Sequence, residues 1–512
     1  MGVKVLLYGF HHLFHLDVIR NLVKCNNWEP RYWIGGLEHE KEIKKRYPKA
    51  IFHDSFSAVL GIPPDGFCEL ELRALDQPLL EDLAYYEAIV LKMMDKMDPY
   101  KIFAYNERLQ LYYLQLKYWL SILEKLNIRI VIFESVPHEV SSYIIYILAR
   151  WKGLRTITFN VTAFRHLVVP LDNYEDDFPA VVLYKELLAK GNYGHVSLSL
   201  ATEETLKKTR LPDYDNALPF STIMLFDTFN KRDVTNRTCA QTVFEFYRDI
   251  RRILGSIRQP PRQNYVKRKR KTFQASRLLP RYKHELYKFR FKLKKRKMAF
   301  YYKSMAQTLD LKAKYVYVPL HYQPELTTSP LGGSFVCQDL MVELLSKAIP
   351  EGWLLYVKEH FSQFVERSQG ECCRSLEYYD NIASLPNVKL ASLSQSTFAL
   401  IDNALAVANV GGTAGFEAVV RGTPVITFGH AWYNGCEGVY YTPSYEECKR
   451  VLNEIEKGCV VDYEKVRLFM YALEKTSLHG FLYSKNQKYS GISVEENVRN
   501  LTQVIQEMCR GI

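Results

Sequence analysis

The feature that most constrains the fold of this 512-residue chain is an alternation of short apolar runs with longer amphipathic runs, which recurs in both halves. In the first half, the runs 3–8, 128–133 and 155–159 have the length and composition of buried strands, and residues 107–126 carry apolar side chains at helical spacing. Strand, helix and strand in this order form the unit of a parallel sheet. The pattern therefore predicts an α/β protein.

The second half repeats the pattern at a more regular spacing. Expected strands alternate there with expected helices at 315–320, 335–348, 353–358, 373–383, 388–391, 405–410, 414–421 and 424–428. Because a chain of 512 residues with 47% hydrophobic content exceeds one compact core, we expect two doubly wound, Rossmann-like domains, at 1–225 and 311–485. We expect a basic helical linker at 226–310 and a helix in 486–512 that crosses back to the first domain. Two such domains with a ligand cleft between them form the GT-B architecture.

The positive charge of the chain is concentrated in one segment. Residues 251–303 hold 20 of the 68 Lys and Arg residues against the single acid Glu285, which leaves 48 basic and 55 acidic residues elsewhere. Cations mixed with aromatic residues suit an anionic membrane surface, where each Lys or Arg contributes about 1 kcal/mol of attraction. A solvated helical linker is the close alternative. A nucleic-acid site uses the same ingredients but ranks well behind, so we expect no nucleic-acid partner.

The cysteines and the lengths of the apolar runs predict the cellular compartment of the protein. The ten Cys residues include no Cys-x-x-Cys pair and no His spacing suited to zinc, which indicates reduced thiols. The run at 1–9 is too short for a signal peptide, and no run approaches the roughly 18 apolar residues of a spanning helix. We expect a cytoplasmic protein, peripheral at the inner face of a bacterial inner membrane through residues 251–303.

The most specific motif begins at Gly411-Gly412-Thr413, between an expected strand and an expected helix. Bare N–H groups and the dipole at a helix N-terminus attract an anion such as a phosphate, and glycines let that anion approach the backbone. Thr413 adds a hydroxyl donor, and Glu417, one turn later, is placed to accept hydrogen bonds from ribose hydroxyls. The alternative is an ordinary tight turn with Glu417 as a solvated acid.

Two further polar clusters follow neighbouring strands of the same expected sheet. His321, Gln323 and Glu325 lie just past one strand, and Lys358 and His360 follow the next. Open α/β sheets bind ligands at this edge, and a lysine there suits a phosphate or a sugar carboxylate. Taken singly, His321 could simply bond a backbone carbonyl, and Lys358 could form a surface pair with the adjacent glutamate.

These motifs carry a family resemblance. Residues 314–325, the Lys358-Glu-His360 triplet, and the block from Gly411 with 428–433 resemble the capsule polysaccharide biosynthesis family, which includes transferases of 3-deoxy-D-manno-octulosonic acid (Kdo) from its CMP derivative. The resemblance implies a glycosyltransferase with the GT-B fold, a nucleotide-sugar donor and a glycan or glycolipid acceptor. By match of motif, the residues lining the donor pocket would be His321, Lys358, His360, Thr413 and Glu417. Family members often have Pro where Phe361 stands here.

The catalytic residue is expected in the N-terminal half, where Glu134 and His138 follow the strand at 128–133 and Ser135 can cap the next helix. If the linkage forms with retention, as the family implies, Glu134 attacks the anomeric carbon and holds a covalent sugar, while His138 orients it or moves a proton. The alternative is an acid and a histidine that only stabilise a helix dipole.

No metal or cofactor is expected. The loop of His11, His12 and His15 offers further bases near the cleft, but no carboxylate cluster joins these histidines in the sequence. A CMP-sugar has one phosphate, which Lys358 and the helix dipole can neutralise. The nucleotide sugar is thus a substrate, with a CMP-linked donor favoured.

Two other functions remain open from the sequence. A non-hydrolysing UDP-sugar epimerase shares the two-domain fold and a similar Gly-Gly…Glu helix start. A non-catalytic component of a polysaccharide assembly would keep the fold without the chemistry.

Overall fold

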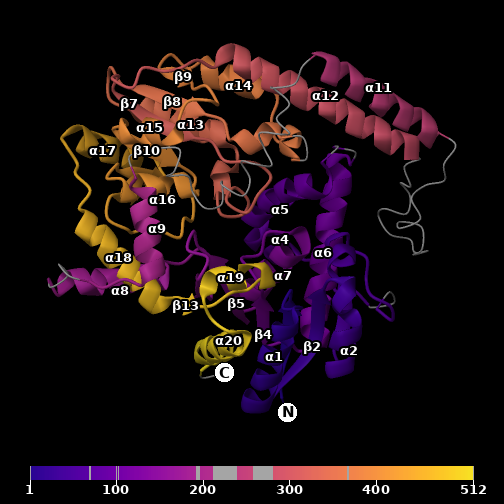
Figure 1. Cartoon of the computed structure of the whole chain (residues 1–512). Coiled ribbons are helices and arrows are strands. Elements are labelled where there is room, and N and C mark those ends of the chain that lie inside the picture. The colour runs from indigo at the N-terminus through magenta and orange to yellow at the C-terminus, as the bar shows by residue number, and fades with distance from the viewer. Residues whose placement is uncertain are drawn as a thin grey trace. The chain divides into compact units, whose positions relative to one another are not determined.

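The computed structural model describes residues 2–67, 71–99, 101, 103–191, 196–211, 239–257, 281–365 and 368–510, except for the side chains of 239–243 and 281. The chain forms two compact units, which are described separately (Figure 1). Unit 1 comprises residues 1–94, 104–198 and 468–512, and unit 2 comprises residues 95–103 and 199–467. Of the expected linker, residues 226–238 and 258–280 lie outside the described residues.

Unit 1 contains a seven-stranded sheet in the order β13-β6-β5-β4-β1-β2-β3. Its strands are β1 (Val3–Tyr8), β2 (Trp28–Gly35), β3 (Ile51–Asp54), β4 (Ile130–Phe133), β5 (Arg155–Val161), β6 (Leu167–Leu171) and β13 (Leu478–His479). The five strands β5, β4, β1, β2 and β3 are parallel to one another, β6 is antiparallel to β5, and β13 is antiparallel to β6. Tyr8 pairs with Ile34 on one side and with Phe133 on the other, so β1 lies at the centre of the sheet.

The helices of unit 1 flank this sheet; the end of α5 lies in unit 2, and α18 begins in unit 2. They are α1 (Leu13–Asn26), η1 (Leu37–His39), α2 (Glu40–Arg46), α3 (Ser55–Val59), α4 (Gln77–Asp82), α5 (Ala84–Met97), α6 (Tyr105–Lys125), α7 (Val140–Trp151), α8 (Pro179–Ala189), α18 (Tyr463–Thr476), η7 (Ser484–Asn486), α19 (Gln487–Ser490) and α20 (Val494–Met508). The C-terminal helix α20 packs beside α1, and Arg155 donates a hydrogen bond to the Met508 carbonyl. Apolar residues of α20, among them Leu501 and Ile505, are fully buried in this core.

Helix α7 begins later than its sequence indicates. Its N-cap is Glu139, while the Ser135 hydroxyl lies 3.5 Å from the Val136 carbonyl, so the expectation that Ser135 caps this helix is wrong. The intervening loop instead continues the line of β4, because the Glu134 N–H donates to the Tyr8 carbonyl at 2.9 Å.

Unit 2 contains a six-stranded parallel sheet in the order β12-β11-β10-β7-β8-β9. Its strands are β7 (Tyr315–Pro319), β8 (Leu354–Lys358), β9 (Val388–Leu390), β10 (Ala406–Asn409), β11 (Val425–Thr427) and β12 (Val439–Tyr441). Every residue of β7 and of β10 is buried. Covered on both faces, these central strands are continuous runs of buried residues, as is usual in a parallel sheet.

The helices of unit 2 include the long basic pair α11 and α12. They are α9 (Leu200–Thr209), α11 (Cys239–Ser256), α12 (Arg281–Met305), η4 (Gly333–Val336), α13 (Gln338–Ala348), η5 (Phe361–Phe364), η6 (Gly370–Cys372), α14 (Leu376–Ala383), α15 (Thr397–Asp402), α16 (Thr413–Val420) and α17 (Tyr445–Glu456). Figure 1 shows α11 and α12 side by side, in agreement with their contacts.

Both sheets have the same winding, which confirms the two doubly wound α/β units expected from the sequence. In unit 1 the chain runs outward from β1 to β3 and then returns to the other side of β1 with β4. In unit 2 it runs from β7 to β9 and returns beside β7 with β10. Loops at the carboxyl ends of the two strands that flank such a reversal border a crevice in which α/β proteins bind ligands.

Several cations of α12 are bound inside unit 2 rather than presented to solvent. The ammonium of Lys295 lies 2.9 Å from the Glu371 carboxylate and donates to two backbone carbonyls, and Lys292 lies 2.7 Å from Asp249 of α11. Arg296 forms an ion pair with Glu245 of α11. The basic segment therefore holds a helical hairpin together as well as carrying charge.

Among the described helices, none combines the length and the apolar character that crossing a bilayer requires.

Candidate functional site

The Gly411-Gly412 turn connects β10 to α16 at the crevice of unit 2. Gly412 is the N-cap of α16 and has extended backbone angles, and the described residues provide no side-chain cap for this helix start. The first-turn N–H groups of a helix lack intrahelical partners and carry the positive end of its dipole. The turn therefore has the chemistry of an anion site at the place where the sequence put it.

His321 joins this turn to the loop after β7. Its Nε2 accepts a hydrogen bond of 3.1 Å from the Val410 N–H, so this nitrogen carries no proton. Burial lowers the pKa of His321 to about 3, and the ring is neutral at pH 7. A Cβ on Gly412 would lie 2.3 Å from His321 Cε1, so only glycine allows the imidazole this close approach. The two loops at the reversal between β7 and β10 are thus in contact.

Residues distant in sequence hold His321 in position. The Gln338 side chain accepts from the His321 N–H at 2.6 Å and donates to its carbonyl at 3.0 Å, and Arg374 donates to the same carbonyl at 3.1 Å. Arg374 in turn pairs with Glu359 at 2.8 Å, with both side chains wholly buried, and the Tyr379 hydroxyl donates to that carboxylate at 2.9 Å. Sequence analysis missed Gln338 and Arg374, because no local pattern marks them.

The carbonyl of Gly412 is fixed by two further residues that sequence analysis missed. The Tyr433 hydroxyl donates to it at 2.7 Å, and the Asn409 amide donates to it at 3.3 Å. Asn409 ends β10, so its position after a buried strand was the available signal. Because these two donors hold the Gly412 carbonyl, the fold itself sets the orientation of the N–H groups in the turn.

Gln323 and Glu325 occupy different environments in the loop after β7. The Gln323 amide is buried, donates to the Val336 carbonyl at 2.6 Å and accepts from Gln338 at 3.1 Å and from Arg374. Both ends of this amide thus bind protein groups. Glu325 is exposed and accepts from the Thr327 hydroxyl at 3.0 Å. The expected donor-binding role of these two residues stays a prediction.

Lys358 and His360 follow β8 and lie on either side of the buried Glu359. The Lys358 ammonium is half-buried and donates to the Gln395 carbonyl at 2.5 Å, and burial lowers its pKa to about 8. It is therefore mostly a cation at pH 7. His360 is exposed and accepts at Nδ1 from the Ser362 N–H at 3.2 Å. The alternative of a surface pair between Lys358 and Glu359 is wrong, because Glu359 pairs with Arg374.

Glu417 is a buried acid of unit 2 with one unpartnered oxygen among the described residues. It is only 6% exposed, and its Oε1 has no hydrogen-bond partner among the described residues. Burial raises the pKa of this carboxyl to about 7, although Arg421 and the Thr413 hydroxyl oppose that rise. A buried carboxylate oxygen without a partner is costly, which favours a ligand that donates to it. The alternative of a solvated acid is wrong for Glu417.

Glu134 has a similar character at the crevice of unit 1. It follows β4, is 9% exposed, and has a pKa that burial raises to about 7, against the effect of a hydrogen bond from the Phe10 N–H. Gly9 has a φ of +78°, and a Cβ there would lie 2.5 Å from Glu134 Oε2. The imidazole beside Glu134 is that of His12, with Nε2 3.8 Å from Oε1. His138 donates from Nδ1 to the Val136 carbonyl at 2.8 Å.

The histidines after β1 are divided by the fold. His15 turns into the core, where it is fully buried against Phe14, whereas His11 and His12 stay at the sheet edge. They meet His39 of η1 there, with candidate ligand atoms of the three rings all within 4.8 Å of one another. Sequence analysis missed His39 because it follows a different strand.

One segment of the chain matches a known protein family. Residues 262–457 match the sequence model of a family described as capsule polysaccharide biosynthesis protein. This segment contains β7 to β12 and all the residues of the Gly411 turn and its surroundings, and the match confirms the resemblance drawn from the motifs. No curated protein matches the chain at a significant level.

Solved structures give only distant similarities. UDP-GlcNAc 2-epimerase from Neisseria meningitidis bound to UDP-GlcNAc is 11% identical, with 99% of each chain covered and a TM-score of 0.22. The beta Kdo 2,7 transferase KpsC from Thermosulfurimonas dismutans is 16% identical over 42% of this chain and 62% of its own, with a TM-score of 0.23. The calicheamicin glycosyltransferase CalG4 is 10% identical, covering 99% and 98%, with a TM-score of 0.21. Such values assign no activity to this chain.

Proposed function

We propose that this protein is a glycosyltransferase that moves Kdo or a related acid sugar from a CMP-linked donor to a glycan or glycolipid in capsule or surface polysaccharide synthesis. The observation that carries the proposal is the buried, unpartnered Oε1 of Glu417, one turn into the helix that Gly412 opens. This acid lies within the segment that matches the capsule family. A helix start beside such an acid offers one site for a phosphate and one for a ribose.

The donor is proposed to bind through three groups of unit 2. The phosphate lies at the N-terminus of α16, the Lys358 ammonium neutralises it, and the Glu417 carboxylate accepts from the ribose hydroxyls. A single phosphate needs no metal ion for this, so we expect donor binding to persist in a chelator. His321 supports the turn as a neutral ring and contributes no charge.

Thermal-shift measurements against CMP, UDP, GDP and their sugars test the donor class. A ligand that binds only the folded state raises its stability in proportion to RT ln(1 + [L]/Kd). We expect stabilisation by cytidine nucleotides and its loss in Glu417→Ala, which removes the oxygens that would accept from the ribose hydroxyls. Selective stabilisation by UDP would instead favour an epimerase, which interconverts a free nucleotide sugar without an acceptor. No stabilisation by any nucleotide would contradict the proposal.

Gly412→Ala is expected to weaken donor binding at least tenfold. The added methyl meets the His321 ring at 2.3 Å, and because that ring is fixed through its backbone by Gln338 and Arg374, the turn itself must shift. A loss of about 1.4 kcal/mol in binding free energy is enough for a tenfold weaker affinity. Calorimetric titration with CMP measures the change. Gly255→Ala is the matched control, since a Cβ there meets nothing within 4 Å.

Catalysis is proposed to lie with Glu134 of unit 1, with retention of the anomeric configuration. The ionised carboxylate attacks the anomeric carbon, the bond to the CMP phosphate breaks, and the acceptor hydroxyl then displaces the enzyme-bound sugar. His138, which follows Glu134 in the loop after β4, is the candidate group for moving the acceptor proton. Burial of Glu134 prepares a carboxylate that is poorly solvated and therefore reactive.

Membrane association is proposed to use the outer face of α11. Phe244, Tyr247, Arg251 and Leu254 recur at helical spacing and are exposed, while Glu245 faces α12. A soluble helix normally directs its apolar face inward, so this inverted arrangement indicates a surface that meets an apolar phase. Aromatic side chains beside arginine suit the interface of an anionic bilayer.

Tyr247→Glu is expected to reduce binding to anionic phospholipid vesicles about tenfold, because it removes an interfacial ring and adds a negative charge worth about 1 kcal/mol. Co-sedimentation with anionic and with zwitterionic vesicles measures this effect. Val460→Glu provides the control, since Val460 is 84% exposed and lies outside the hairpin. Equal binding by both variants would rule out the α11 surface.

A further inference from the structure

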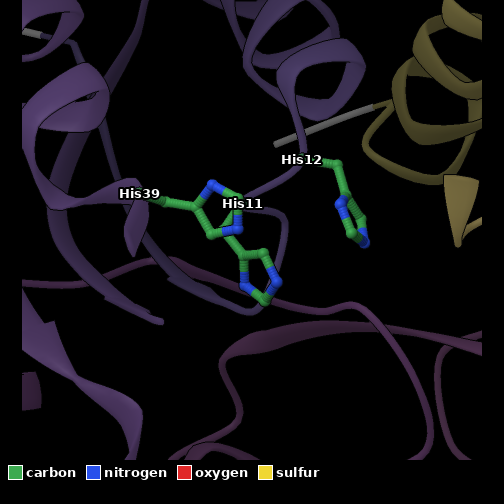
Figure 2. A group of neighbouring side chains, drawn as sticks. All are labelled: His11, His12 and His39. Carbon is green, nitrogen blue, oxygen red and sulfur yellow. The ribbon is translucent and has the colours of Figure 1, made fainter. Parts of the chain in front are cut away.

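We propose that His11, His12 and His39 form a binding site for one divalent transition-metal ion, with Zn²⁺ as the preferred occupant. Figure 2 shows the rings of His11 and His39 side by side, with His12 to one side of them. The site is separate from the proposed donor site, whose residues all belong to unit 2. It therefore goes beyond the proposed function and can be tested without any sugar nucleotide.

The sheet brings the three histidines together. His11 and His12 follow β1, and His39 lies in η1, directly after β2. Because β1 and β2 are neighbouring parallel strands, with Tyr8 paired to Ile34, the loops that follow them leave the sheet at the same edge. His12 is also the N-cap residue of α1, which fixes the backbone from which its ring extends. The cluster thus lies directly after two neighbouring parallel strands.

The distances suit closure around a small ion. The candidate ligand atoms lie within 4.8 Å of one another. The His11 and His39 rings stack with centroids 4.5 Å apart, and the His11 and His12 rings lie 5.0 Å apart. A tetrahedral zinc ion with bonds of about 2.0–2.1 Å places its nitrogen ligands about 3.3 Å apart. Small rotations of half-buried rings therefore close the site around the ion.

The cluster contains a buried ring nitrogen that no described residue bonds. His11 Nδ1 is buried and has no hydrogen-bond partner among the described residues. An ion would give the buried nitrogen a partner.

Carboxylates stand beside two of the rings. Glu38 Oε1 lies 3.5 Å from His39 Nε2, and Glu134 Oε1 lies 3.8 Å from His12 Nε2. Carboxylates next to metal-binding histidines fix the orientation of the ring and raise its basicity. The sequence prediction that no carboxylate cluster joins the histidines after β1 stays a prediction, since Glu38 and Glu134 are single carboxylates beside His39 and His12.

The ligand set decides which ion fits. Imidazole nitrogens suit Zn²⁺, Cu²⁺ and Ni²⁺, whereas Mg²⁺ and Ca²⁺ prefer oxygen ligands. Three protein ligands leave one position of a tetrahedral ion open for water or another oxygen ligand. All three rings are only half-buried, so an ion can enter from solvent.

Titration of the chelator-stripped full-length protein with Zn²⁺ and with Co²⁺ tests the site. We expect one high-affinity ion per chain, and a cobalt spectrum with visible bands of four-coordinate geometry. Sulfur-to-cobalt charge transfer in the near ultraviolet should be absent. This absence separates the histidine site from a cysteine site, such as one formed by Cys372 and Cys373 of unit 2. A chain that binds no ion, or binds it through sulfur, would overturn the proposal.

Replacement of His39 identifies the ligands. Because loss of even an outer partner of a metal ligand costs 10- to 100-fold in affinity, His39→Ala is expected to weaken Zn²⁺ binding by at least about tenfold. His39→Asp, which keeps a ligand atom, should bind more tightly than His39→Ala. His479→Ala is the matched control, since His479 is an exposed histidine of the same unit outside the cluster. Circular dichroism checks that each variant is folded, and equal affinity of His39→Ala and the parent would contradict the assignment.

Discussion

Glu134→Gln is expected to lower the rate of sugar transfer by at least about 1,000-fold while leaving nucleotide binding unchanged. The amide keeps the shape of the side chain in its buried position beside Gly9 but cannot attack the anomeric carbon. The proposed nucleotide ligands belong to unit 2, so the thermal shift with CMP should persist. Initial rates at saturating donor and acceptor measure the loss. A variant with more than a tenth of the parental rate would place the nucleophile elsewhere.

The pH dependence of the transfer rate is a second test of the role of the Glu134 carboxyl. Burial raises the pKa of Glu134 to about 7, and the nucleophile is the ionised form. The rate should therefore rise with pH below about 7, where only a fraction of Glu134 is ionised, and level off above it. Glu139→Gln is the control at the same sheet edge, because Glu139 accepts from the Tyr8 hydroxyl at 3.1 Å and the amide oxygen can still accept. A non-catalytic assembly component would show no transfer in the parent protein.

The strands of unit 2 could be predicted from sequence because the central ones are covered on both faces. A segment such as Tyr315–Pro319 has no solvated face and therefore carries an unbroken apolar run. The expected strand 353–358 and the observed Leu354–Lys358 differ by one residue. Helix starts were harder to predict, as α7 shows. Ser135 has the residue type of an N-cap, but Glu134 and Val136 still donate to carbonyls of the sheet, and the N-cap is Glu139.

Some residues of the candidate site could be located from the sequence, and others could not. His321, Lys358 and the Gly411 turn could be located because each follows a buried strand, and parallel strands end at a common edge. Arg374 lies 53 residues beyond His321 and reaches its carbonyl only through the folding of η6 and α14. His39 reaches His11 in a similar way, from the neighbouring strand. No periodicity in the chain encodes such contacts, because they depend on which strands become neighbours.

The pair of Glu359 and Arg374 carries the other large expected effect. Both side chains are wholly buried, and Arg374 also donates to the carbonyl of His321 and to Gln323. Glu359→Ala would leave a buried guanidinium without its counter-charge, which typically costs about 3–5 kcal/mol. We expect a loss of stability of this size in urea unfolding followed by circular dichroism. We also expect weaker binding of CMP, because His321 borders the Gly412 turn.

The control is an ion pair of the same type on the surface of the same unit. Arg450 and Glu454 lie one turn apart on α17 at 2.7 Å, with side chains 63% and 47% exposed. Glu454→Ala should cost no more than about 0.5 kcal/mol, since solvent already screens this pair. The double variant Glu359→Leu, Arg374→Met should recover much of the stability lost in Glu359→Ala, because two apolar side chains leave no buried charge. If it recovered stability but not CMP binding, Arg374 would be needed to position His321 as well as to balance Glu359. If Glu359→Ala were as mild as Glu454→Ala, the buried pair would not be what holds the loop after β7.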